Sequence, residues 1–141
     1  MRERARSQKI DVPFDADLGD GAPSAWAGDI EQLIFQGSRF VEEVVFFHKA
    51  SSTLILADLV IAFEPEHVRP HLRWLFALGG MTSPGQTPRD LRATFWGREP
   101  RARASYQQML GWQPRRAIFA HGRFYLDDAT AQLERAFAWL R

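Results

Sequence analysis

The chain has 141 residues, a length that fits one domain, and 45% of them are hydrophobic, which is ample for a folded core. It contains no cysteine, so disulfides, thiolate metal sites and cysteine nucleophiles are excluded, and only His, Asp or Glu could bind a metal. The net charge is +1, with an acidic excess in residues 1–67 and a basic excess in residues 68–141. The arginines form no block of like charge, so we expect no nucleic-acid partner.

The chain has no segment with the roughly 18 consecutive apolar residues that a membrane helix requires, and its N-terminus carries no apolar signal core. We therefore expect a cytoplasmic protein with no membrane partner. Residues 1–24 mix Arg, Asp, Gly and Pro without a helical or strand period, which predicts an irregular arm. A single folded domain is expected over residues 25–141.

Three apolar segments in the first half predict strands. Residues 30–35 and 41–47 carry the apolar, β-branched and aromatic residues typical of strands, and Gly37 and Ser38 separate them. After a short polar connection, residues 53–61 form a nearly continuous apolar run that only Asp58 interrupts. Such a run is typical of a strand that is covered on both faces.

The second half is mainly helical. Apolar residues at helical spacing predict helices over residues 70–78, 88–96 and 101–110, and residues 116–120 predict a short strand. A final helix is expected to begin at residue 127 or 128 and to bury Leu133, Phe137 and Leu140. The five tryptophans stand at positions typical of a core, and we interpret them as core residues. Together these elements predict an α/β or α+β fold in which helices cover a β-sheet.

Three polar residues stand where predicted strands end or break. His48 follows the run EEVVFF, Asp58 follows TLILA, and His121 follows AIFA. Two imidazoles and a carboxylate suit Zn²⁺, Fe²⁺ or Mn²⁺ and leave coordination positions open for water. No two of them share a compact spacing such as HExxH, so the residues alone favour structural roles: a cap or turn for Asp58 and hydrogen-bonded strand ends for the histidines.

Two other groups invite a functional interpretation. His67 and His71 have the i, i+4 spacing of a metal-binding pair on a helix. Pro70 between them implies that the helix begins there, so the two histidines would not lie on one helical face. Ser51 and Ser52 lie beside His48 without an acidic third member, so we interpret them as turn residues.

The segment WAGDIEQLIFQGSRFVEEVVFFHKASSTLILADLV, the run RRAIFAHG and the closing helix ending in AFAWL resemble the C-terminal half of an uncharacterised domain family related to the metallo-β-lactamase fold. The resemblance spans roughly residues 11–141. It implies an α/β sandwich with His48, Asp58 and His121 as metal ligands to zinc or iron. Asp58 would be the catalytic member, as a bridging or water-orienting ligand.

The earlier HxHxDH-like motif of such enzymes is absent from this sequence. The resemblance therefore implies a degenerate metallo-hydrolase-like domain with a residual single-metal site, for which no small-molecule substrate can be assigned. The alternative is a non-catalytic binding or scaffold module that kept the fold and lost the metal chemistry. If the ligands are right, His48, Asp58 and His121 should lie within about 8 Å of one another, because strand ends of one sheet meet at a common edge.

The resemblance also implies that relatives in this family are longer and have an N-terminal sheet, which would cover the second face of these strands. This chain lacks such a segment, so an apolar sheet face is expected to be left open. The sequence therefore predicts a homodimer through this face, or a partner chain that replaces the missing N-terminal segment.

Overall fold

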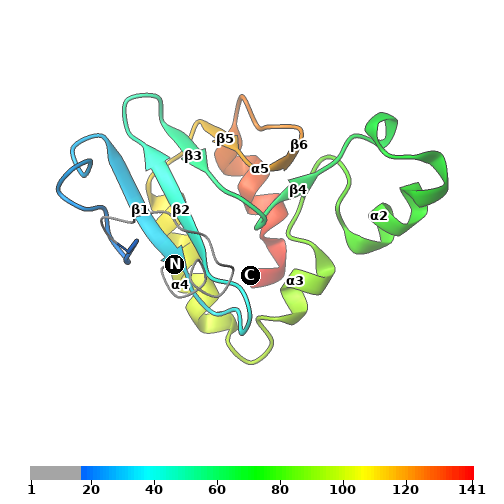
Figure 1. The fold of residues 1–141 in the computed structure, drawn as a ribbon, viewed down its shortest axis with the longest axis horizontal. Helices are drawn as coiled ribbons and strands as arrows, with labels where there is room; N and C mark the ends of the chain where they lie inside the picture. Colours follow the sequence, from blue (N-terminus) through cyan, green and yellow to red (C-terminus); the bar gives the residue numbers. More distant parts are fainter. Residues whose placement is uncertain (1–16) are drawn as a thin grey trace, which may run out of the picture.

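The fold, a computed structural model that describes residues 17–141, is centred on a four-stranded sheet with the strand order β1-β2-β3-β5 (Figure 1). Its strands are β1 (Ile30–Phe35), β2 (Glu43–His48), β3 (Thr53–Ile55) and β5 (Arg116–Ile118). The first three pair antiparallel, and β5 pairs parallel with β3. Two shorter strands, β4 (Ile61–Ala62) and β6 (His121–Gly122), pair parallel with each other in a second, two-stranded sheet.

The helices follow mainly in the second half of the chain. They are α2 (Arg73–Gly79), α3 (Arg89–Ala93), α4 (Glu99–Gly111) and α5 (Ala129–Ala136), with 3₁₀ turns at Pro65–His67, Pro70–Leu72 and Ala138–Leu140. In Figure 1, α4 and α5 lie behind the sheet on one side, whereas α2 stands at the right, away from it. Within residues 17–141, no helix is long and apolar enough to cross a bilayer.

Alternation along the strands decides which sheet face is buried. The side chains of Leu33, Phe35, Val45, Phe47 and Leu54 are at most 7% exposed and belong to one core cluster with residues of α4 and α5. The ring of Phe35 lies 5.6 Å from that of Phe137. Burial of Leu133, Phe137 and Leu140 confirms the predicted inward stripe of the last helix.

The opposite face of the sheet is also apolar but only partly buried. Its side chains come from the alternate positions of the same strands and include Ile34, Val44, Phe46, Ile55 and Ile118. In residues 44–47 both faces are apolar, as expected, whereas β1 adds Gln32 to the second face, where it is 2% exposed and bonds to Gly19.

Strand 30–35 and the final helix lie where the sequence predicts them, and β2 begins two residues later than predicted. The single strand predicted over residues 53–61 is wrong, because the ladder ends at Ile55 and resumes at Ile61. The intervening backbone turns toward the carboxylate of Glu43, which accepts three of its N–H groups.

The core interpretation of the tryptophans is correct in part. Trp112 and Trp139 pack against the core cluster, but Trp74 and Trp96 are 66% and 77% exposed. Helical spacing indicates that residues share a face, and it does not say whether anything covers that face.

The first sixteen residues of the predicted arm, which was expected over residues 1–24, lie outside the described part of the chain. In the part that is described, the side-chain amide of Gln32 donates to the carbonyl oxygen of Gly19 at 2.8 Å. The backbone N–H of Ile34 donates to the carboxylate of Asp20 at 3.0 Å. Residues 19–20 are thus tied to β1.

Candidate functional site

Asp58 and His121 lie side by side beyond the ends of neighbouring strands. The carboxylate oxygen Oδ1 of Asp58 is 3.2 Å from Nε2 of His121, and the two side chains are 57% and 47% exposed. The pair therefore combines a carboxylate and an imidazole at a surface that solvent and solutes can reach.

The pairing follows from the parallel arrangement of β3 and β5. The backbone N–H of Leu56 donates to the carbonyl oxygen of Ile118 at 2.9 Å, and that of Ala120 donates to the carbonyl oxygen of Ala57 at 3.2 Å, so the two segments stay in register past the ends of β3 and β5. Asp58 follows Ala57, and His121 follows Ala120. Since parallel strands end at the same edge of a sheet, both side chains reach the same place.

The turn that carries Asp58 is built around a buried carboxylate. Glu43, the first residue of β2, accepts backbone hydrogen bonds from Ala57 at 2.6 Å, Asp58 at 2.8 Å and Leu59 at 3.0 Å. Only 7% of Glu43 is exposed. These bonds hold the Asp58 backbone in the position that brings its side chain to His121.

Burial raises the pKa of the Glu43 carboxyl above its ordinary value, because a charge is poorly solvated there. The three backbone N–H groups oppose this shift, and the nearby carboxylate of Asp58 adds to it. Two carboxylates thus share this end of the sheet, one buried and one exposed.

His121 is fixed on its other side by packing. The ring of Phe63 lies 5.9 Å from the imidazole, and Phe63 packs in turn edge-on against Phe76 of α2 at 5.2 Å. Gly122, directly after His121, has a φ of +94°, and a side chain there would overlap the backbone of Ala62. A glycine is required for β6 to approach β4 this closely.

His48 lies at the other end of the sheet. It pairs with Thr53 at the start of β3, whereas Asp58 follows the end of β3. The imidazole Nδ1 is 2.8 Å from the hydroxyl of Ser51, which itself donates to Thr53 Oγ1 at 2.8 Å. The Ser51 proton is therefore directed away from His48, which supports Ser51 as a turn residue and His48 as a hydrogen-bonded strand end, and not a nucleophile and its base.

The prediction that His48, Asp58 and His121 lie within about 8 Å of one another is thus wrong for His48. Among residues 17–141, no group of three or more His, Cys, Asp or Glu side chains is placed to hold a metal ion. His67 and His71 belong to two successive 3₁₀ turns, and His67 instead faces Glu64 at 3.6 Å. The structure brings together two of the three expected ligands.

Sequence reasoning missed Glu43. Its signal was an acidic residue at the start of an otherwise apolar strand that runs antiparallel to the strand before Asp58. In such a pair, the start of one strand lies beside the end of the other.

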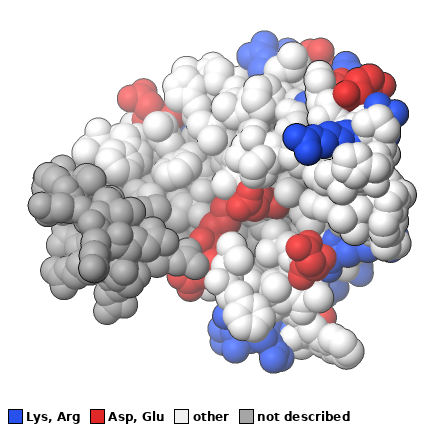
Figure 2. Space-filling model, turned by 45° about the vertical axis from the view of Figure 1, so that its right-hand side comes forward, with Lys and Arg blue, Asp and Glu red and all other residues white. Residues whose placement is uncertain are grey.

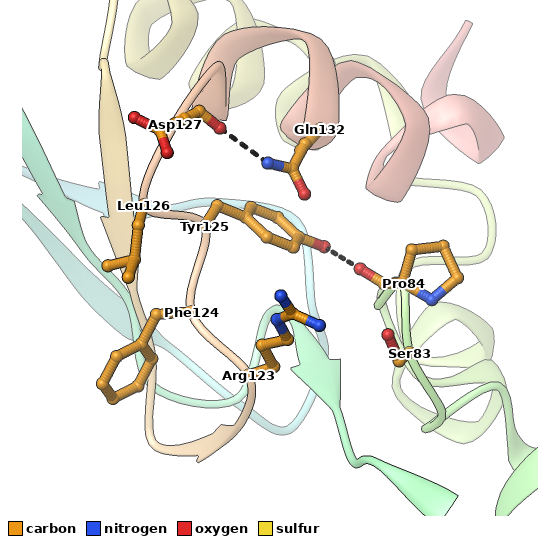
Figure 3. Close-up of a pocket in the computed structure, with 8 residues that line it drawn as sticks. All are labelled: Ser83, Pro84, Arg123, Phe124, Tyr125, Leu126, Asp127 and Gln132. Atoms are coloured by element: carbon orange, nitrogen blue, oxygen red, sulfur yellow. Dashed lines mark hydrogen bonds between the residues drawn. The ribbon is translucent and has the colours of Figure 1, made fainter.

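A pocket of about 350 Å³ lies beside the segment that follows β6, and Figure 3 shows its lining. The Tyr125 hydroxyl donates to the Pro84 carbonyl at 2.7 Å, and the Gln132 amide donates to the Asp127 carbonyl at 2.7 Å. Burial raises the pKa of Tyr125 to about 12, so its hydroxyl stays protonated at neutral pH. The lining includes neither Asp58 nor His121, so this pocket is separate from the pair.

No protein-family model matches the sequence, and a comparison with curated proteins found no match. The fold is similar to a crystal structure of the DIM-1 metallo-β-lactamase exposed to ceftazidime, with a TM-score of 0.54 and 17% sequence identity. The similarity covers 99% of this chain and 53% of that one, so the chain spans about half the length of this neighbour. The α/β layers are those of a metallo-β-lactamase-like fold.

Proposed function

From a metallo-β-lactamase-like fold that holds Asp58 against His121, we propose a degenerate metallo-hydrolase-like domain in which these two residues remain from a metal site. The observation that carries the proposal is the 3.2 Å separation of Asp58 Oδ1 and His121 Nε2. Ligand atoms bound to one tetrahedral zinc ion at about 2.0–2.1 Å lie roughly 3.3 Å apart, so the pair could bind one ion with little movement.

The donor set is nevertheless incomplete. Catalytic zinc sites use three protein ligands and keep the fourth position for water or substrate. Within residues 17–141 only two ligands converge, since His48 lies at the opposite end of the sheet. We therefore derive no hydrolytic step through a metal. The catalytic role proposed for Asp58, orienting a metal-bound water, would require further ligands beside this pair.

The proposal predicts weak binding of one Zn²⁺ ion per chain. Asp58→Ala and His121→Ala should each weaken binding by more than about tenfold, since each removes one of two ligands. His48→Ala should leave binding unchanged and is the matched control. Isothermal titration calorimetry with Zn²⁺, repeated with Fe²⁺ under anaerobic conditions, measures all four proteins.

Equal affinity in all four proteins would contradict the proposed pair, as would loss of binding in His48→Ala. The absence of any binding by the wild type would favour the second candidate function below.

The second candidate is a non-catalytic binding or scaffold module. The partly exposed apolar face of the sheet, which includes Ile34, Val44 and Phe46, supports it. Apolar side chains that the fold leaves partly exposed are commonly found at protein interfaces. We propose that a second copy of the chain covers this face.

The dimer proposal predicts twice the 16.2 kDa chain mass in light scattering at micromolar concentration. Phe46→Glu should yield monomers, because it would place an unpaired charge in the interface. Glu31→Gln is the control, because it changes only an exposed ion pair between β1 and Lys49, and this variant should remain dimeric. A wild-type monomer that binds no hydrophobic dye would contradict this proposal.

A further inference from the structure

Helix α2 presents an apolar face to solvent. Trp74, Leu75 and Leu78 are 66%, 45% and 58% exposed. Side chains three and four positions apart are neighbours on a helix, so these three form one continuous surface, which we term the α2 face. A helix in a globular protein ordinarily turns such a face toward the core.

The α2 face cannot turn inward because the other side of the helix is already packed. Phe76 lies edge-on against Phe63, whose ring contacts the imidazole of His121. The carbonyl oxygen of Phe76 also accepts the backbone N–H of Met81 at 2.9 Å, which ties the end of the helix to the segment that follows. The outward direction of Trp74, Leu75 and Leu78 is therefore set by the fold.

Exposed arginines stand at the start of α2, and two acidic residues, Glu64 and the exposed Glu66, lie in the turn before it. Arg69 and Arg73 are exposed at the start of the helix, and residues 67–88 contain no Asp or Glu. In the described part of the chain neither guanidinium is paired with a carboxylate, and Arg73 Nε donates only to the Val68 carbonyl at 3.2 Å. In Figure 2, with the α2 side of the molecule turned forward, uncharged surface predominates, and charged side chains of both signs lie on it in small separate groups.

Tryptophan and leucine beside arginine is the composition of helices that lie in a membrane interface. The indole ring and leucine side chains enter the boundary between headgroups and acyl chains, and arginine reaches back to anionic headgroups. We propose that the α2 face, with Arg69 and Arg73, docks on an anionic membrane surface. The expectation of no membrane partner rested on the absence of a spanning segment, and surface docking requires none.

The proposal is tested with the full chain and vesicles of phosphatidylcholine, with and without phosphatidylglycerol. The protein should sediment with the anionic vesicles, and brominated lipids should quench its tryptophan fluorescence. Trp74→Phe should abolish most of that quenching. Leu75→Gln with Leu78→Gln should lower the partition coefficient by about tenfold or more, since two apolar side chains no longer enter the interface.

Trp96→Phe is the matched control, because Trp96 is 77% exposed on a different segment. It should leave binding and quenching unchanged. Arg69→Gln with Arg73→Gln should reduce binding to anionic vesicles and remove most of its dependence on salt.

Three results would overturn the proposal. One is an unchanged partition coefficient in the double leucine variant, and another is loss of quenching in Trp96→Phe in place of Trp74→Phe. The third is a dimer in light scattering that the double leucine variant converts to monomer, since the occupant of the α2 face would then be a second copy of the chain.

Discussion

Replacing Gly122 with valine should lower the free energy of unfolding by about 4 kcal/mol or more, the largest effect expected from a single substitution in this fold. The backbone of Gly122 has a φ of +94°, a conformation that β-branched residues avoid. A Cβ atom would also overlap the carbonyl oxygen of Ala62 and lie 2.7 Å from the backbone nitrogen of Phe63. Strands β4 and β6 would have to separate, and His121 would move away from Asp58.

Urea denaturation measures this effect. Gly111→Ala is the matched control, because it stands at the end of α4 with no heavy atom within 4 Å of the added Cβ and no positive φ. That substitution should be neutral or stabilising by up to about 1 kcal/mol. A Gly122→Val protein as stable as wild type would show that the close approach of β4 and β6 does not exist.

Glu43→Ala should cost about 3 kcal/mol of stability. The substitution removes the acceptor of three backbone N–H groups, those of Ala57, Asp58 and Leu59, at a site with little access to water. Each buried donor left without a partner is destabilising by about 1–3 kcal/mol, less whatever the turn recovers by opening to solvent. Opening the turn would also displace Asp58.

The neighbouring Glu42→Ala provides the control, since Glu42 is exposed. It should change the free energy of unfolding by no more than about 0.5 kcal/mol. Equal stability of the two variants in urea would contradict the structural role of Glu43.

The raised pKa of Glu43 fixes the sign of its pH dependence. In the folded chain the pKa of this carboxyl lies above the ordinary value of 4.5. At a pH between 4.5 and the raised pKa, the folded state therefore binds more protons than the unfolded state. Stability contributed by Glu43 therefore falls as pH rises through this interval and is constant above it. Glu43→Gln cannot ionise, so the stability difference between wild type and this variant should change with the same sign, and parallel curves would contradict the shift.

Local pattern predicted most of the fold. Alternation identified β1 and β2, and helical spacing identified the last helix with its buried residues Leu133 and Phe137. It missed the break between Ile55 and Ile61, because the groups that end the ladder belong to Glu43, which is distant in sequence. An apolar run does not reveal hydrogen bonds that come from another strand.

The candidate site was predicted in part for a related reason. Asp58 and His121 meet because they follow the parallel strands β3 and β5. His48 ends β2, which runs antiparallel to β3, so its side chain is at the opposite edge. The rule that strand ends converge holds for parallel strands only, and strand direction was not available from spacing alone.

The exposed α2 face was missed because composition cannot distinguish a buried apolar stripe from an unpartnered one. Trp74 and Phe76 are both large aromatic residues on a single helix turn, yet among residues 17–141 only Phe76 packs against another ring. The difference depends on where Phe63 lies, which is set by the pairing of β4 with β6.

The most direct test of the Asp58–His121 pair as a residual metal site is anomalous X-ray scattering at the zinc edge from crystals soaked in Zn²⁺. We expect one peak about 2.0–2.2 Å from a carboxylate oxygen of Asp58 and from Nε2 of His121, with water in the remaining positions. His48 should not be a ligand. A zinc ion bound through His48, or a fully occupied ion elsewhere with none at the pair, would contradict the proposed site.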